Sequence, residues 1–194
     1  MTSRSLAAAL APTSVAIVGA SDNPNKVGGR PLLYLSKFGF AGRIYPINPT
    51  RDQVQGFRSY PDLAALPEAP DLAIIATPGD LVAQAVDDCA SRGVGVTIVM
   101  SSGYGETSDP AAIAAERAMV ARARRAGMRL VGPNSQGLAN FGTGAVASFS
   151  TMFLEVPPMD GPVAVISQSG MMSVVPYGLL RAKGELVCIC DSDA

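Results

Sequence analysis

Short runs of valine and isoleucine alternate with longer helical patterns along almost the whole 194-residue chain. Apolar runs of this length are typical of strands buried on both faces of a parallel sheet, and the helices between them supply the crossovers. The alternation therefore predicts an α/β fold with a parallel sheet. The strands are expected at residues 14–18, 43–47, 72–76, 95–100, 129–131, 163–166 and 186–189.

Two helices have clear sequence signals. One is expected at 110–126, because Asp109 can cap its first N–H groups, Pro110 needs no donor there, and Gly127 suits a left-handed end. The other follows Gly79. Its apolar residues recur at three- and four-residue spacing, which predicts that one side faces the sheet. These residues are Leu81, Val82, Ala85, Val86 and Cys89.

Weaker patterns predict a helix within residues 1–12 and a short helical turn after Pro61. Met171 and Met172 follow a glycine at the start of a helical pattern, and we expect them to fill the core.

The composition excludes several classes of function. A net charge of −1 provides no basic field for nucleic acid, and no apolar run is long enough to cross a membrane. The sequence has no histidine, which excludes serine–histidine and cysteine–histidine catalysis and histidine-ligated metals in this chain. The three cysteines, Cys89, Cys188 and Cys190, do not form a disulfide framework, so we expect a reducing cytoplasm and no metal site.

The chain divides into two unequal parts. Residues 142–162 lack strong periodicity and contain Pro157, Pro158 and Gly161, which predicts a connection between domains. Beyond it, Val-Ala-Val-Ile-Ser-Gln-Ser echoes the earlier Val-Ala-Ile-Val-Gly-Ala-Ser. We therefore expect one domain at 1–157 and the incomplete start of a second at 158–194.

Small and polar residues follow the first two predicted strands, at the sheet edge where parallel sheets bind ligands. The first strand leads into Gly19-Ala20-Ser21, and Lys26 and Arg30 in the same loop would add positive charge for a phosphate. The second leads into Asn48-Pro49-Thr50-Arg51. An NAD site needs an acidic residue at Asn48, whereas Arg51 suits an additional ribose phosphate, as in NADP or coenzyme A.

The next three strands end in loops of the same kind. They are Ala-Thr-Pro-Gly at 76–79, Ser-Ser-Gly-Tyr-Gly-Glu at 101–106 and Gly-Pro-Asn-Ser-Gln-Gly at 132–137. A purely structural sheet does not require such loops at every strand, so their convergence favours a ligand site.

The ordered set of motifs resembles the ADP-forming acyl-CoA synthetases, relatives of the succinyl-CoA synthetase α subunit. The set is Val-Gly-Ala-Ser, Lys-Val-Gly-Gly-Arg-Pro, Ile-Asn-Pro, Ala-Thr-Pro, Ser-Ser-Gly-Tyr-Gly-Glu, Gly-Pro-Asn-Ser-Gln-Gly and Ser-Gln-Ser-Gly. The likeness covers about residues 12–191. It implies a Rossmann-like domain that binds coenzyme A, followed by the start of a flavodoxin-like domain.

The resemblance also implies site residues. Asn134 would lie near the thiol end of the coenzyme, and a phosphohistidine's phosphate would meet the helix start formed by Ser167, Ser169 and Gly170. The full set of implied coenzyme A-binding residues is Gly19, Ala20, Ser21, Lys26, Asn48, Pro49, Arg51, Thr77, Pro78, Ser102, Gly103 and Asn134.

This chain departs from the family pattern at two points. Many relatives have a lysine where Thr50 and Arg51 stand, which puts the contact to the coenzyme's 3′-phosphate in question. The family's phosphorylated histidine belongs to a part of the second domain beyond this chain. We therefore expect no catalytic residue in these 194 residues, and no activity from them alone.

Three functions follow from these observations. The first is the coenzyme A-binding part of an acid–CoA ligase that works through an acyl phosphate and a phosphohistidine, with ATP or ADP, Mg²⁺ and an ATP-grasp domain or subunit supplied by other parts of the enzyme. The second is a non-catalytic coenzyme A-binding or regulatory module. The third, a nicotinamide-dependent oxidoreductase, is disfavoured by Asn48. An exposed sheet edge in the second part would also promote a homo-oligomer.

Overall fold

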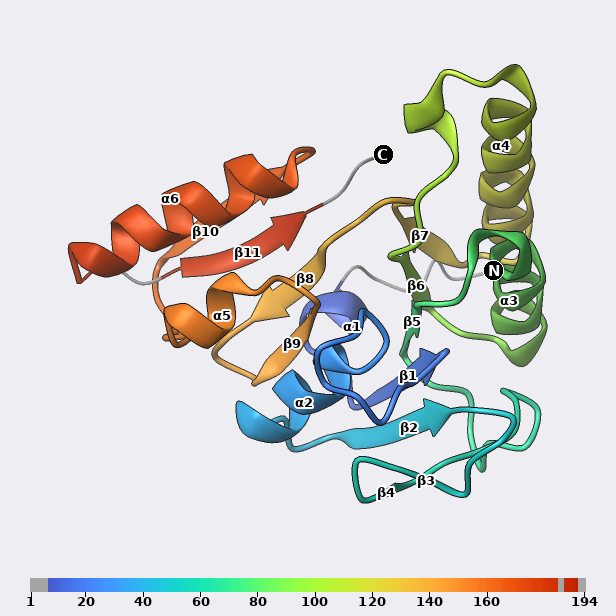
Figure 1. Cartoon of the computed structure of the whole chain (residues 1–194), viewed down its shortest axis with the longest axis horizontal. Helices are drawn as coiled ribbons and strands as arrows, with labels where there is room; N and C mark the ends of the chain where they lie inside the picture. Colours follow the sequence, from blue (N-terminus) through green and yellow to red (C-terminus); the bar gives the residue numbers. More distant parts are fainter. Residues whose placement is uncertain (1–6, 185–186, 192–194) are drawn as a thin grey trace.

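The computed structural model describes residues 7–184 and 187–191, with backbone alone described for the last five (Figure 1). A parallel five-stranded sheet has the order β2-β1-β5-β6-β7. Its strands are β1 (Ser14–Val18), β2 (Arg43–Ile47), β5 (Leu72–Ile75), β6 (Val96–Val99) and β7 (Arg129–Val131). The predicted α/β, Rossmann-like fold is thus confirmed, and the predicted strands differ from these at most by one residue at either end.

Both faces of this sheet are buried, which explains the apolar runs. Along β1, Val15 and Ile17 belong to one hydrophobic cluster, whereas Ala16 between them belongs to the other. The same alternation runs through β5, where Leu72 and Ile74 face away from Ala73 and Ile75. Successive strand residues point to opposite faces, so an entirely apolar strand requires cover on both sides.

Helices α3 (Gly79–Arg92) and α4 (Pro110–Arg125) cover one face and pack side by side (Figure 1). The predicted caps of α4 are confirmed, since Asp109 Oδ1 accepts from the Ala111 N–H at 3.0 Å and Gly127 has φ +70°. The predicted inner side of α3 is confirmed for four of its five residues. The prediction for Leu81 is wrong, since its side chain is 51% exposed. Leu81 directly precedes the buried Val82, and one residue turns an α-helix by about 100°, which directs Leu81 away from the sheet.

The opposite face is covered by α1 (Ala7–Leu10), by α2 (Arg30–Lys37) and by a hairpin of β8 (Gly137–Asn140) and β9 (Ala145–Ser148). Part of the predicted N-terminal helix, residues 1–6, lies outside the described residues. A second hairpin, β3 (Gln53–Val54) with β4 (Phe57–Arg58), adjoins the edge strand β2. Residues 61–68 form turns that bury Leu63 and Leu66, and not the expected helical turn.

A second sheet has the order β10-β11-β8-β9, with β10 (Val163–Ser167) parallel to β11 (Val187–Asp191). Residue 186 of the predicted seventh strand lies outside the described residues. Helix α5 (Met152–Glu155) follows β9, and α6 (Gly170–Ala182) follows β10. Residues 142–162, predicted to connect two domains, contain β9 and α5. The sheet joins strands from both sides of residue 157, and the predicted division there stays a prediction.

The β8–β9 hairpin ties the two sheets together. Leu138 and Ala147 belong to the cluster under the first sheet, whereas Ala139 and Val146 on the reverse face pack with aromatic side chains. In this aromatic group, Phe153 of α5 has its ring centroid 5.9 Å from Tyr34, 5.5 Å from Phe141 and 5.4 Å from Tyr177.

The outer side of α6 is apolar and exposed. Met171 and Met172 are 68% and 61% exposed, so the expectation that they fill the core is wrong for the described residues. Among the helices described, none is long and apolar enough to cross a membrane.

The aromatic group predicts a large stability difference between two adjacent residues of α5. Phe153→Ala should lower the free energy of unfolding by about 3–5 kcal/mol, because it removes a buried ring and leaves a cavity. Leu154→Ala, at a position that is 41% exposed, should change it by less than about 1 kcal/mol. Urea denaturation measures both values, and equal effects would contradict the packing described.

Candidate functional site

A cavity of about 720 Å³ opens at the carboxyl edge of the first sheet, between the loops that follow β1, β5 and β6. In the order β2-β1-β5-β6-β7, the chain leaves β1 toward one face and leaves β5 toward the other. Loops therefore part at this switch point, which is where open α/β sheets bind ligands. Six of the predicted coenzyme A-binding residues line the cavity: Gly19, Ser21, Lys26, Thr77, Pro78 and Ser102.

The loop of residues 19–29 is closed by its own backbone. The N–H groups of Gly19 and Ala20 both donate to the Ile47 carbonyl, and that of Ser21 donates to the Gly28 carbonyl. A Cβ at Gly28 would lie 2.1 Å from the Gly19 oxygen, and one at Gly29 would lie 2.0 Å from the Asn23 oxygen. The glycines are needed for this close backbone approach, and the first three N–H groups are used inside the protein.

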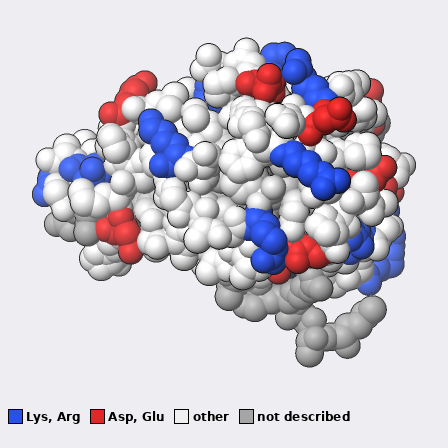
Figure 2. All heavy atoms as spheres, turned by 90° about the horizontal axis from the view of Figure 1, so that it is seen from below, with Lys and Arg blue, Asp and Glu red and all other residues white. Residues whose placement is uncertain are grey.

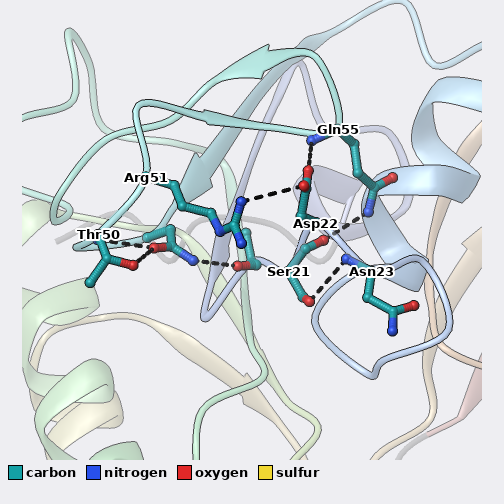
Figure 3. Close-up of polar contacts among 8 residues, drawn as sticks. Ser21, Asp22, Asn23, Thr50, Arg51 and Gln55 are labelled. Carbon is teal, nitrogen blue, oxygen red and sulfur yellow. Dashed lines mark hydrogen bonds and ion pairs between the residues drawn. The ribbon is translucent and has the colours of Figure 1, made fainter.

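Side chains from the segment after β2 brace this loop (Figure 3). The Asn48 side-chain nitrogen donates to the Ala20 carbonyl at 2.9 Å, and its oxygen accepts from Thr50. Gln55 Nε2 donates to the carbonyls of Ser21 and Gly29, at 2.9 Å each. Asn48 therefore supports the loop and does not line the cavity.

Gln55 was missed by sequence reasoning. It lies in the hairpin turn between β3 and β4 with φ +49°, and its N–H donates to Asp22. The only sequence signal at that point is the following glycine, Gly56, which indicates a turn but not what the turn contacts.

The two arginines near the loop do not line the cavity. Arg51 pairs with Asp22, with 3.4 Å between Nη1 and Oδ2, and both side chains are about half exposed (Figure 3). Arg30 donates to the carbonyls of Asn25 and Phe149. Among the residues that line the cavity, all of them described, Lys26 alone is charged. On the face in Figure 2, basic and acidic side chains are interspersed.

The loops after β5 and β6 are fastened to each other. Ser101 Oγ donates to the Thr77 carbonyl at 2.5 Å, and Tyr104 donates through its hydroxyl to the Gly79 carbonyl at 2.9 Å. The Thr77 hydroxyl is buried, and no described residue hydrogen-bonds to it. A buried hydroxyl without a partner costs free energy, so stability alone does not explain a threonine here.

Gly103 lines a neighbouring groove of about 540 Å³ between α3 and α4, which shares Gly79 and Ser102 with the first cavity. The Gly103 and Tyr104 N–H groups both donate to the Glu106 carboxylate. Burial acts to raise the pKa of Glu106, but these N–H donors outweigh it and hold the pKa below its usual range. The Glu106 carboxylate thus holds the backbone of Gly103 and Tyr104, next to the Ser102 that both hollows share.

Of the other predicted residues, Ala20, Pro49 and Asn134 do not line the cavity. Asn134 follows the cis Gly132–Pro133 peptide with φ +57°, and its N–H donates to the Ser101 carbonyl at 2.9 Å. Its side chain is exposed at the same sheet edge.

The second predicted site forms a tight turn at the start of α6. Ser167 Oγ accepts from the Ser169 N–H and donates to the Ser169 carbonyl, at 3.0 Å each. A Cβ on Gly170 would lie 2.1 Å from Nε2 of Gln136. The structure therefore brings the α6 start against the loop that contains Asn134, although the two are far apart in the sequence.

Cys89 is not suited to nucleophilic catalysis. Its side chain is fully buried in the cluster beneath α3, and this burial raises the pKa of the thiol to about 12. In the part of the chain that the structure describes, no three Cys, Asp or Glu side chains gather as metal ligands.

Comparison with known sequences places this geometry in a family. The family model described as the CoA binding domain matches residues 13–140, which include β1 to β8 and the whole cavity. The ADP-forming acetate–CoA ligase I subunit alpha of Pyrococcus furiosus is 34% identical over 178 residues, which are 90% of this chain and 37% of the relative. The ADP-forming acetate–CoA ligase I of Archaeoglobus fulgidus is 39% identical over 159 residues, 82% of this chain and 22% of the relative.

A solved structure supports the same assignment. The dinucleotide-forming acetyl-coenzyme A synthetase 1 of Ca. Korarchaeum cryptofilum, in complex with phosphate and ADP, matches with a TM-score of 0.88 and 34% identity. The match covers 97% of this chain and 39% of that protein, so the chain spans well under half the length of these relatives. The resemblance to ADP-forming acyl-CoA synthetases is confirmed, and the chain belongs to the family of CoA binding domains.

Proposed function

We propose that the cavity between the ends of β1, β5 and β6 binds coenzyme A as part of an ADP-forming acid–CoA ligase. The observation that carries this proposal is the position of the cavity at the switch point of the family-matched sheet, with one charged side chain, Lys26, on its wall. Lys26 and the loop of residues 19–29 would face the pyrophosphate. The protein has almost no net charge, so an anion would be attracted by the one cation on the cavity wall.

The remaining residues divide into contacts and supports. Thr77 and Pro78 would form the wall beside the adenosine or the pantetheine, and Ser102 and Gly103 would guide the thiol arm along the two adjoining hollows. Gly19, Ala20 and Asn48 would act mainly by shaping the loop, since their described hydrogen bonds are internal, and Pro49 follows Asn48 outside the cavity. Arg51 would reach a 3′-phosphate only by leaving Asp22.

The reaction would be completed by other parts of the enzyme. The relatives are named ADP-forming acetate–CoA ligases, and a ligase of this kind would form an acyl phosphate and relay phosphate through a histidine. The sequence contains no histidine, so these 194 residues would bind coenzyme A without catalysing the relay. A non-catalytic coenzyme A-binding module therefore remains the second candidate function.

We place the phosphoryl group of such a relay at Ser167, Ser169 and Gly170, where the first N–H groups of α6 begin. Its closeness to the Asn134 loop supports this assignment, because a thiol and an acyl phosphate must meet. In this proposal residues 1–157 bind the coenzyme and 158–194 begin a flavodoxin-like domain. ATP or ADP, Mg²⁺ and an ATP-grasp domain or subunit would act from elsewhere, in the cytoplasm.

The first test is ligand choice by thermal denaturation. Coenzyme A at about 100 times its dissociation constant should stabilise the chain by about 2.7 kcal/mol, whereas NAD and NADP should leave the melting temperature unchanged. Stabilisation by NADP in place of coenzyme A would assign the cavity to a different nucleotide and reject the proposal.

A second test addresses the charge at the cavity. Lys26→Gln should weaken coenzyme A binding about tenfold in calorimetry, or ~1.4 kcal/mol, because it removes the one cation on the wall. Lys37→Gln, an exposed lysine at the other end of α2, is the matched control and should leave the affinity unchanged. Equal affinities for the two variants would exclude Lys26 as an anion contact.

We also propose that this chain self-associates through its exposed apolar side chains. These are Ile166 on the edge strand β10 and Met171, Met172, Val175 and Leu179 on α6. Light scattering should show a dimer or larger species that Ile166→Lys shifts toward monomer, because a charge on an edge strand opposes pairing. A monodisperse wild-type monomer would contradict this expectation.

A further inference from the structure

We propose that Arg30 is a positioning residue that couples the coenzyme-binding loop to the second sheet, an inference that rests on the proposed function. Arg30 is the first residue of α2, directly after the loop of residues 19–29. It does not line the cavity. Its guanidinium instead joins two segments that are separated by more than 100 residues of sequence.

The first segment is the loop itself. Arg30 Nη2 donates to the Asn25 carbonyl at 3.1 Å, and Asn25 and Lys26 both line the cavity. The Arg30 backbone N–H donates to the Lys26 carbonyl at 3.0 Å. Arg30 thus holds Asn25 through its side chain and Lys26, the one charged residue of the cavity wall, through its main chain. Moving the guanidinium would release the carbonyl next to Lys26.

The second segment connects β9 to α5. Arg30 Nη1 donates to the Phe149 carbonyl at 2.9 Å, and Tyr34, one helical turn along α2, donates to the Ser150 carbonyl at 2.6 Å. Burial raises the pKa of Tyr34 to about 12, against the opposing charge of Arg30. The two side chains hold adjacent carbonyls, but only Arg30 also holds the loop.

The planar fork of arginine is what makes the bridge. One guanidinium presents several N–H donors in fixed directions, whereas a lysine ammonium is a single point that cannot hold both carbonyls in the same way. The Arg30 Nε is buried, and no described residue accepts from it. Leaving this donor unpaired costs free energy, so the position of the side chain favours the bonds of Nη1 and Nη2 over a bond of Nε. Because both bonds share one group, order in the loop and docking of the 149–155 segment stabilise each other.

The decisive variant is Arg30→Lys, which keeps the charge and removes the bridge. By calorimetry, coenzyme A should bind about tenfold more weakly, while the slope of log affinity against log salt concentration stays that of the wild type. Tyr34→Phe, the matched control, removes only the Ser150 bond and should keep the affinity within about twofold. Wild-type affinity in Arg30→Lys would overturn the proposal.

Amide hydrogen exchange without ligand gives a second, independent outcome. Arg30→Lys should speed exchange at Lys26 and Gly29 in the loop and also at Leu154 and Val156 after the second segment, whose N–H groups make local bonds. Tyr34→Phe should speed only Leu154 and Val156. If the wild type binds no coenzyme A, the proposed function fails, yet this experiment still decides the coupling. Faster exchange in only one of the two segments of Arg30→Lys would reject it.

Discussion

The parallel pairing of β1 with β2 on one side and β5 on the other is the constraint on which the rest of the structure depends. Because β1 lies between β2 and β5 and is buried on both faces, its chain leaves toward α2, whereas the chain from β5 leaves toward α3. The two exits diverge and leave a space between them at the sheet edge. The cavity is therefore a consequence of strand order, and the loops determine what it accepts.

The loop after β1 is organised before any ligand arrives. Its first three N–H groups already have acceptors, and Asn48 and Gln55 donate hydrogen bonds to its carbonyls. Its glycines allow distant parts of the loop backbone to come into contact. A loop fixed in this way loses little conformational entropy on binding, which favours affinity from few contacts. Because these N–H groups already have acceptors inside the protein and Lys26 is the one charged side chain on the cavity wall, the proposed anion contact depends on Lys26.

The sequence was informative where the pattern is local and repeated. Apolar strands, the caps of α4 and the inner side of α3 follow from spacing and from residues next to one another. The strand β9 could not be recognised, because Ala145-Val146-Ala147-Ser148 has a weak strand pattern and its pairing with β8 is a tertiary event. The side-chain hydrogen bonds of Arg30 and Gln55 could not be predicted for the same reason, since each partner lies 26 or more residues away, apart from Asn25. Residue type indicates that an arginine near a glycine-rich loop can meet a phosphate, but only the fold decides which acceptor it reaches.

The two similar strand-loop-helix units, both proposed to bind anions, differ in how far the helix start lies from the strand end. After β1, residues 19–29 separate the strand from α2, so the helix start is remote and the loop with Lys26 forms the wall. After β10, only residues 168–169 intervene, so the first turn of α6 lies directly at the strand end, where N–H groups and the helix dipole can act without a basic side chain. Gln136 packs on that turn at Gly170, and the Asn134 N–H is bonded to Ser101 in the first cavity's wall. The short loop after β7 therefore contacts both sheet edges, which is the arrangement that the proposed meeting of a thiol and a phosphoryl group would need.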